Sequence, residues 1–344
     1  MIDTRTGAKP SFEKIPLNPV QREAVSFHGA PQLVFAGAGT GKTRVLTAKI
    51  AYLIEVKKIP SDRIFAATFT NKAASEMRER ISALLGMSCE GLWIGTFHSL
   101  CARLLRREAT ALGYSHDFTI YDDDDQMSLV KKMLKERSID EKSISPRQAL
   151  GVISRYKNAC TPPEEVPESS QASFYEREML EIYRLYTKAL KRHNAMDFDD
   201  LIANPVYLFR KNPELLERYR QKFQYVLVDE YQDTNVAQFK LVHLLASQHR
   251  AIFVVGDDDQ SIYGWRGANV DNILSFEKHF PSTQVTKLEQ NYRSTQPILS
   301  FAHSIITSNV RRAEKKLWTS RQGGDDVVVT KYRDDRHEAD AVVA

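Results

Sequence analysis

The sequence predicts an α/β protein whose parallel sheet is assembled from two separated pieces of chain. Short apolar runs alternate with amphipathic helical stretches, which is typical of a parallel sheet covered by helices. Between about Arg107 and Asp199 the chain changes to charged, helix-forming sequence. We therefore expect an inserted, mostly helical subdomain that interrupts the sheet. The five expected strands are Leu33–Ala36, Ile64–Thr68, Leu92–Gly95, Tyr225–Val228 and Ile252–Val255.

Further elements are expected in the carboxyl-terminal region. A strand pattern at Val285–Leu288 precedes a helix pattern at Thr295–Ser308, and Val327–Tyr332 is a last strand pattern. The segment Asp334–Ala344 has the pattern of an amphipathic helix, yet it stops without a C-cap glycine or a polar tail. We therefore expect the chain to be cut at this end.

Composition limits the possible classes of protein. The 344 residues suffice for two or more domains, and a formal net charge of only +4 means that contacts with nucleic acid must come from local patches. Three scattered cysteines without a C-x-x-C pair argue against a disulfide framework or a zinc site and favour a reducing cytoplasm. Met1–Pro16 lacks the layout of a signal peptide, and no apolar run reaches about 18 residues. We expect neither secretion nor a membrane span.

A glycine-rich loop joins the first expected strand to a helical pattern. Its backbone N–H groups can turn toward phosphates, Lys42 can reach the β- and γ-phosphates, and the Thr43 hydroxyl can bind Mg²⁺. Ala36 stands where the strict pattern has a glycine. A tight structural connection is the alternative, but the loop favours binding of a nucleoside triphosphate. The residues between the strand and Lys42 are Gly37, Ala38, Gly39, Thr40 and Gly41.

Two carboxylates follow the strand pattern at Tyr225–Val228. Ligands of open parallel sheets gather at the carboxyl ends of the strands, where Asp229 and Glu230 would lie. Asp229 is suited to hold hydrated Mg²⁺, and Glu230 to orient or deprotonate an attacking water. A solvated acidic turn is the alternative reading.

Polar and aromatic residues follow other strand patterns. Gln260 can contact a γ-phosphate, and three residues after it can stack on single-stranded nucleic acid or bind its backbone. Phe69 and His98 each stand where a strand gives way to a helix, which offers further platforms. Packing of Trp265 in a core and a purely structural His98 remain the alternatives. The three residues after Gln260 are Tyr263, Trp265 and Arg266.

Two charged runs are assigned no chemistry. Asp122–Asp125 is expected to cap a helix and complement its dipole rather than to bind a metal. The basic run Arg311–Lys316 is expected to be a solvated face.

Six motifs together resemble those of superfamily 1 DNA helicases of the UvrD/Rep/PcrA type. The resemblance extends from Leu17 to about Trp318, and it implies RecA-like P-loop NTPase domains. Residues 1–107 and 200–287 would form a first RecA-like domain, 108–199 its helical accessory subdomain, and 288–344 the incomplete start of a second. The motifs, in chain order, are AGAGTGKT, TFTNKAASEMRERI, GTFHSL, VLVDEYQDTN, VVGDDDQSIYGWRGA and LEQNYRS.

The resemblance also implies roles for individual residues. Gln21 would hydrogen-bond the adenine base, Arg44 and Tyr292 would sandwich its ring, and Arg293 would reach the γ-phosphate. ATP and Mg²⁺ would be the cofactors. Single-stranded DNA, including junctions with duplex, would bind with little sequence specificity. The residues implied to bind DNA are Phe69, His98, Tyr263, Trp265 and Arg266.

The later motifs of these helicases, including a second arginine finger, do not occur in the sequence. An arginine finger contributes ~10³–10⁵ in rate, so we expect slow ATP hydrolysis and no unwinding by this chain, although the resemblance implies a 3′-to-5′ motor of DNA repair or replication. A short, non-catalytic module that binds nucleotide and DNA and recruits partner proteins is an alternative. A small-molecule kinase is another, but Tyr263 and Trp265 count against it.

Overall fold

The computed structural model describes residues 10–86, 88, 91–140, 142–167 and 173–344. Its centre is a six-stranded sheet in the order β3-β2-β6-β7-β1-β8, and every neighbouring pair is parallel. Pairing of β2 with β6 joins the two separated pieces of chain, as the sequence predicts. The strands are β1 (Gln32–Ala36), β2 (Ile64–Thr68), β3 (Trp93–Thr96), β6 (Tyr225–Val228), β7 (Ile252–Gly256) and β8 (Gln284–Leu288).

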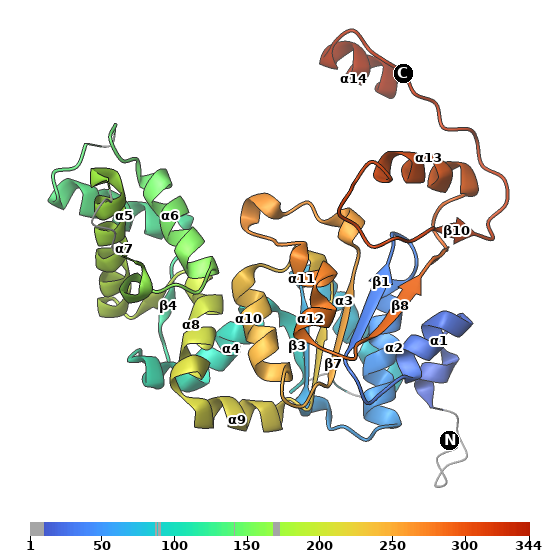
Figure 1. The fold of residues 1–344 in the computed structure, drawn as a ribbon, viewed down its shortest axis with the longest axis horizontal. Coiled ribbons are helices and arrows are strands. Elements are labelled where there is room, and N and C mark those ends of the chain that lie inside the picture. The colour runs from blue at the N-terminus through green and yellow to red at the C-terminus, as the bar shows by residue number, and fades with distance from the viewer. Residues whose placement is uncertain (1–9, 87, 89–90, 141, 168–172) are drawn as a thin grey trace.

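Helices cover both faces of this sheet (Figure 1). Alternation along each strand divides its apolar residues between two cores: Val34 packs in the core with α1, α2 and α3, while Phe35 packs in the core with α4, α8, α9 and α10. The first group comprises α1 (Pro19–Ser26), α2 (Lys42–Glu55) and α3 (Asn71–Leu85). The second comprises α4 (Phe97–Glu108), α8 (Phe198–Lys211), α9 (Pro213–Lys222) and α10 (Val236–Ala246).

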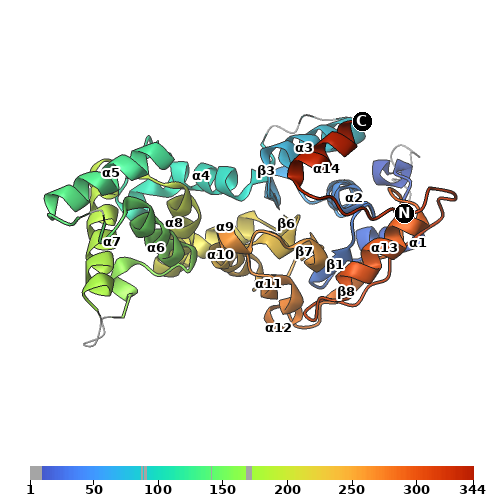
Figure 2. The same ribbon diagram turned by 90° about the horizontal axis from the view of Figure 1, so that it is seen from above.

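The inserted segment forms a helical bundle at one end of the molecule (Figures 1 and 2). Its helices α5 (Asp123–Glu136), α6 (Pro146–Asn158) and α7 (Phe174–Arg192) enclose a hydrophobic core of their own. As predicted, Asp122 caps α5 by accepting from the N–H groups of Asp124 and Asp125. A two-stranded parallel pair, β4 (Thr119–Ile120) with β5 (Ala195–Met196), connects the bundle to the rest.

A buried ion-paired cluster fixes the last turn of α6 against the start of α8. Lys157 Nζ lies 2.7 Å from Asp197 Oδ2 and 2.8 Å from Asp200 Oδ1. Tyr186 donates its hydroxyl proton to the same Asp197 oxygen at 3.0 Å. Because buried charges are tolerated only when paired, this cluster holds the bundle at a defined position.

The carboxyl-terminal region lies at the other end of the molecule (Figures 1 and 2). It contains β9 (Gln290–Asn291) paired with β10 (Trp318–Thr319), then α13 (Gln296–Ile306) and α14 (Asp335–Val343), which has no buried residue. The predicted strand at Val327–Tyr332 is wrong: Val327–Lys331 are exposed, Tyr332 is half-buried, and none of the described strands includes or pairs with these residues.

The prediction for the basic run is also wrong in part. Lys315 is buried, and its ammonium group lies within 2.6–2.9 Å of carboxylate oxygens of Asp257, Asp258 and Asp259. Arg312 forms two hydrogen bonds with Asp259, at 2.8 and 2.9 Å. Mutual attraction between the basic run and the acidic turn after β7 outweighs solvation of either. We call this cluster the ionic lock.

The remaining helices are short, and within the described ranges none of the helices is both long and apolar enough to cross a membrane. These are α11 (Asp271–Leu274), α12 (Phe276–His279) and the 3-10 turns Ser11–Lys14, Ser61–Arg63, Ala109–Leu112, Pro163–Glu165, Tyr231–Asp233, Asp258–Gln260 and Gly264–Arg266.

Candidate nucleotide and nucleic-acid sites

The predicted site residues follow strand ends along one edge of the sheet. Because all six strands are parallel, their carboxyl ends share that edge, where such sheets bind ligands. The phosphate loop follows β1, Asp229 and Glu230 follow β6, and Gln260 lies in the turn after β7. Phe69 follows β2 and His98 follows β3 at the far end of the edge. The strand order therefore separates the nucleotide residues from two of the predicted DNA residues.

The phosphate loop turns directly from β1 into α2. Gly39 and Gly41 have φ of +72° and +91°, a conformation that residues with a side chain rarely adopt. Thr40 is buried, and its hydroxyl donates to the carbonyl of Gly37 at 2.7 Å, which closes the loop. The N–H groups at the start of α2 and its dipole make this an anion-binding position.

Lys42 and Thr43 are the first two residues of α2, and both are half-buried. Lys42 Nζ lies 3.2 Å from Oε2 of Glu230. Ala38 is exposed at the tip of the loop. The lysine is thus paired with a carboxylate at the place where a polyphosphate would compete for its charge.

Asp229 is buried at the end of β6, where its N–H donates to the carbonyl of Ala67 at 2.9 Å. Burial, and then the charge of Glu230, raises the pKa of Asp229 to about 7, while Lys42 opposes the shift. A cation stabilises the ionised form of such a carboxylate. Mg²⁺ commonly combines one or two carboxylates with substrate phosphates, so Asp229 and the Thr43 hydroxyl fit this ion.

The described residues contain no group of three His, Cys, Asp or Glu side chains arranged to hold a metal ion by themselves.

Gln232 connects the two acidic turns of the site. Its amide nitrogen donates to Glu230 at 3.0 Å and to Asp233 at 3.1 Å, and its oxygen accepts from the N–H of Asp257 at 2.9 Å. Asp257 in turn accepts from the side-chain amide of Gln260. Burial raises the pKa of Asp233 to about 6. A continuous hydrogen-bond network therefore runs from Glu230 to Gln260.

The residues predicted to bind adenine meet at the amino end of α1. Gln21 is buried and donates its amide to the carbonyl of Thr40 at 2.8 Å, while its oxygen accepts from the N–H of Asn18 at 3.0 Å. The Arg44 guanidinium lies 5.7 Å from the centre of the Tyr292 ring. The structure thus brings Gln21, Arg44 and Tyr292 together, although the Gln21 amide already holds the loop.

Arg293 lies beside the phosphate loop. The N–H of its neighbour Tyr292 donates to the carbonyl of Gly39 at 2.9 Å. A Cβ placed on Gly39 would lie only 2.7 Å from Cβ of Arg293. The side chain of Arg293, predicted to reach the γ-phosphate, therefore extends from a backbone segment that packs against the loop.

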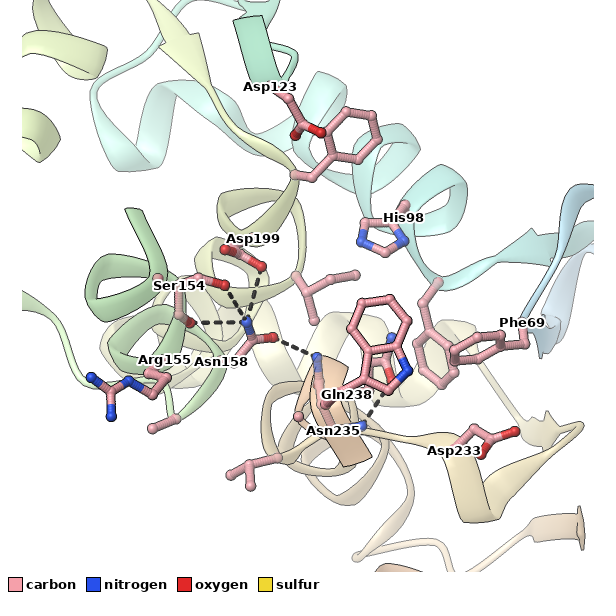
Figure 3. Close-up of a pocket in the computed structure, with 18 of the residues that line it drawn as sticks. Phe69, His98, Asp123, Ser154, Arg155, Asn158, Asp199, Asp233, Asn235 and Gln238 are labelled. Atoms are coloured by element: carbon pink, nitrogen blue, oxygen red, sulfur yellow. Dashed lines mark hydrogen bonds between the residues drawn. The ribbon is translucent and has the colours of Figure 1, made fainter. Parts of the chain in front are cut away.

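An 890 Å³ pocket separates the sheet from the helical bundle, lined by residues of both (Figure 3). Phe69, His98 and Trp265 line it, and Trp265 is 75% exposed, so the alternative of a packed core tryptophan is wrong. Tyr263 lies beside this wall, its ring 5.0 Å from that of Phe69. His98 contacts Phe198 edge-on at 5.8 Å, and burial lowers its pKa.

The pocket is not strongly basic. Asp123, Asp199 and Asp233 line it together with Arg155 (Figure 3). The side chain of Arg266 lies outside the described part of the structure. Aromatic surface rather than positive charge therefore dominates this pocket, as suits stacking of bases.

Comparison with known proteins agrees with this arrangement. The family model of the UvrD/REP helicase N-terminal domain matches residues 17–281, and that of the UvrD-like helicase C-terminal domain matches residues 286–344. The chain belongs to the UvrD/Rep helicase family.

Relatives within the UvrD/Rep family support this assignment. The ATP-dependent DNA helicase PcrA of Bacillus subtilis (strain 168) is 50% identical over 93% of this chain and 43% of the relative. PcrA of Staphylococcus epidermidis (strain ATCC 12228 / FDA PCI 1200) and of Staphylococcus aureus (strain Mu50 / ATCC 700699) are each 48% identical over 95% of this chain and 45% of the relative. The chain thus spans less than half the length of these relatives.

Sequence reasoning missed several polar residues of this UvrD/Rep family chain. Gln232 joins the acidic turns, and Asn291 contacts the phosphate loop. Asn158 of the bundle donates to Asp199 and accepts from Asn235 across the pocket floor (Figure 3). For Asn235 a signal existed, because Asn235 and Gln238 form a capping box at α10. For Gln232 and Asn291, the bonds that join separate segments, to Asp257 and to Ala38, span long sequence separations that leave no local pattern.

Proposed function

We propose that this chain is the ATP- and single-stranded-DNA-binding part of an ATP-dependent DNA helicase that moves 3′-to-5′ along DNA in repair or replication. The observation that carries the proposal is the common edge of the sheet: the phosphate loop and two acidic turns at one end, and an aromatic pocket at the other. Family membership and the names of the PcrA relatives support it.

At the nucleotide end, Lys42 binds the β- and γ-phosphates, and Thr43 and Asp229 hold Mg²⁺, which neutralises phosphate charge. Incoming phosphates draw Lys42 from its ion pair with Glu230. The released carboxylate orients and deprotonates the attacking water. Gln260 contacts the γ-phosphate and its water, and the Arg293 guanidinium stabilises charge on the γ-phosphate.

The rest of the nucleotide site binds the polyphosphate and the base. Backbone N–H groups of the loop cradle the phosphates. Arg44 and Tyr292 move apart and stack on the two faces of adenine. Gln21 hydrogen-bonds the edge of the base with its second amide hydrogen and its second oxygen lone pair, because the bonds to Thr40 and Asn18 use only one of each. The loop residues are Gly37, Ala38, Gly39, Thr40 and Gly41.

At the other end, bases of single-stranded DNA stack on the aromatic side chains that line or adjoin the pocket. Stacking tolerates any base, so sequence specificity is low, and a junction with duplex is the natural substrate of an unwinding motor. The residues that we propose to contact DNA are Phe69, His98, Tyr263, Trp265 and Arg266.

We propose the domain boundaries that the resemblance implies: residues 1–107 and 200–287 as one RecA-like domain, 108–199 as its accessory subdomain, and 288–344 as the start of a second. The separate hydrophobic core of the bundle supports the assignment of residues 108–199 as an inserted subdomain.

A chain without the second arginine finger is a weak motor. The two described cysteines are unpaired and support action in the cytoplasm, with repair or replication proteins as partners.

Two equilibrium titrations test the proposal. Mg–ATP binding is followed with a fluorescent ATP analogue, and DNA binding by anisotropy of a labelled oligo-dT strand, with an equal length of duplex as the competitor. We expect saturable binding of both ligands and preference for the single strand. Nucleotide binding without DNA binding would contradict the helicase assignment, and absence of both would contradict the whole proposal.

A further inference from the structure

One buried amide, that of Asn291, connects the phosphate loop with the turn that carries Arg293. Asn291 is only 2% exposed. Its Nδ2 donates to the carbonyl of Ala38 at 2.6 Å. Its Oδ1 accepts from the N–H groups of Arg293 at 2.8 Å and Ser294 at 2.7 Å. The nitrogen of the amide therefore holds the phosphate loop, and its oxygen holds the turn that carries Arg293.

The bond to Ala38 sets the orientation of a loop peptide. In a trans peptide the N–H points opposite to the C=O, so holding the Ala38 carbonyl directs the N–H of Gly39 away from Asn291. The next carbonyl is held as well, because Gly39 accepts from the N–H of Tyr292 at 2.9 Å. The loop is thus tied to both Asn291 and Tyr292.

Gly39 makes this approach possible. A Cβ at this position would lie 2.7 Å from Asn291 Nδ2 and 2.7 Å from Cβ of Arg293, and Gly39 has φ +72°. The absence of a side chain therefore serves both the backbone conformation and the close packing of the turn.

The oxygen end of the amide fixes the backbone from which Arg293 extends. An Asn oxygen that accepts from the N–H two residues on forms an Asx turn, which replaces the usual backbone turn. The long arginine side chain keeps its own rotamers, but its starting point is set by Asn291.

We propose that Asn291 is a positioning residue with two separable tasks: its Oδ1 sets Arg293 for recognition of the γ-phosphate, and its Nδ2 holds the phosphate loop that ATP and ADP share. The inference rests on the proposed function. ADP lacks the γ-phosphate, so loss of the Oδ1 contacts must weaken binding of ATP more than binding of ADP. A residue that only stabilised the fold would weaken both alike.

The test is the ratio of the Kd for Mg–ADP to that for Mg–ATP, measured by displacement of a fluorescent nucleotide. We compare wild type with Asn291→Ala, Arg293→Ala and the double variant, and use Asn309→Ala, at an exposed asparagine after α13, as the matched control. We expect Asn291→Ala and Arg293→Ala each to lower the ratio about five- to tenfold, the effect of one or two lost hydrogen bonds. The double variant should lower it hardly further.

Asn291→Asp separates the two ends of the amide. Its carboxylate still accepts from the N–H groups of the turn but repels the Ala38 carbonyl. We expect it to weaken Mg–ATP and Mg–ADP alike, with their ratio kept. This variant also decides the matter should Asn291→Ala melt below the assay temperature.

An unchanged ratio in Asn291→Ala, with a lowered ratio in Arg293→Ala, would overturn the inference and leave the proposed function intact. Additive effects in the double variant, or a ratio in Asn291→Asp as low as in Arg293→Ala, would overturn it too. Absence of Mg–ATP binding by wild type would overturn the proposed function and the inference with it.

Discussion

The two ends of the sheet edge differ in how their side chains are held. At the nucleotide end, polar groups already bond to one another: Lys42 pairs with Glu230, and Gln232 and Asn291 each bridge separate turns. At the pocket end, Trp265 is exposed beside Phe69 and His98, and hydrogen bonds of Asn158 with Asp199 and Asn235 hold the floor rather than this aromatic wall. One end is built with fixed geometry, and the other offers open surface.

This contrast fits the two proposed ligands. Polyphosphate has one shape and charge pattern, so preset donors can match it without further ordering. Bases of single-stranded DNA vary, and an aromatic face accepts each of them. The ionic lock joins the two ends, because its aspartates lie in the turn that continues to Gln260 and Trp265.

The largest effect is expected from breaking the ionic lock. Burial opposes the charge of Lys315, but Asp257, Asp258 and Asp259 outweigh it and raise the pKa of the lysine. Lys315→Met leaves the buried carboxylates of Asp257 and Asp258 without the lysine, while Arg312 still pairs with Asp259, so urea denaturation should show a loss of about 3–5 kcal/mol. The exposed neighbour gives the control, Lys316→Met, for which little change is expected. Equal stability of both variants would show that the lock holds nothing in place.

Substitution of Lys42 should affect nucleotide binding and leave DNA binding unchanged. Under the proposed function, Lys42→Ala removes a charged hydrogen bond to phosphate, so Mg–ATP binding should weaken by about 1.5–3 kcal/mol, while the affinity for oligo-dT without nucleotide stays unchanged. Lys131→Ala, at an exposed lysine of the bundle, is the control. A parallel loss of DNA affinity in Lys42→Ala would mean that the two ends are one site.

A substitution in the pocket should have the opposite effect, weakening DNA binding and leaving nucleotide binding unchanged. Trp265→Ala should weaken oligo-dT binding by about 1–3 kcal/mol, the usual contribution of stacking on one base, and leave Mg–ATP binding intact. Trp318→Ala, at a half-exposed tryptophan of β10, is the matched control. Anisotropy titration measures the DNA affinity of both variants. Unaltered DNA affinity in Trp265→Ala would contradict DNA binding in the pocket.

The smallest effect concerns pH. Burial lowers the pKa of His98 below its ordinary 6.5, so the unfolded chain takes up this proton at a higher pH than the folded one. Stability is therefore full above pH 6.5 and falls as the pH drops through the lowered pKa, with a slope below about 1.4 kcal/mol per pH unit for one proton. His98→Gln should remove this part of the slope in denaturation at pH 5.5 and 7.5. Identical slopes in both proteins would contradict the burial of a neutral ring.

Local pattern explains what the sequence could predict. The strands of the sheet and the cap at Asp122 depend on neighbouring residues, and the structure confirms them. Lys315 was missed because its carboxylate partners lie far away in the chain, and Asn291 because its amide acts on a loop near the other terminus. The strand predicted at Val327–Tyr332 failed because β-branched residues form a strand only beside a partner. The ligand-binding roles remain predictions.

The most direct test of the central claim is steady-state ATP hydrolysis with and without an unstructured DNA strand, using Lys42→Ala as the blank. Binding of both ligands along one sheet edge predicts that DNA stimulates hydrolysis and that the blank abolishes it. A rate that DNA leaves unchanged, measured where both ligands are bound, would contradict a DNA-coupled motor.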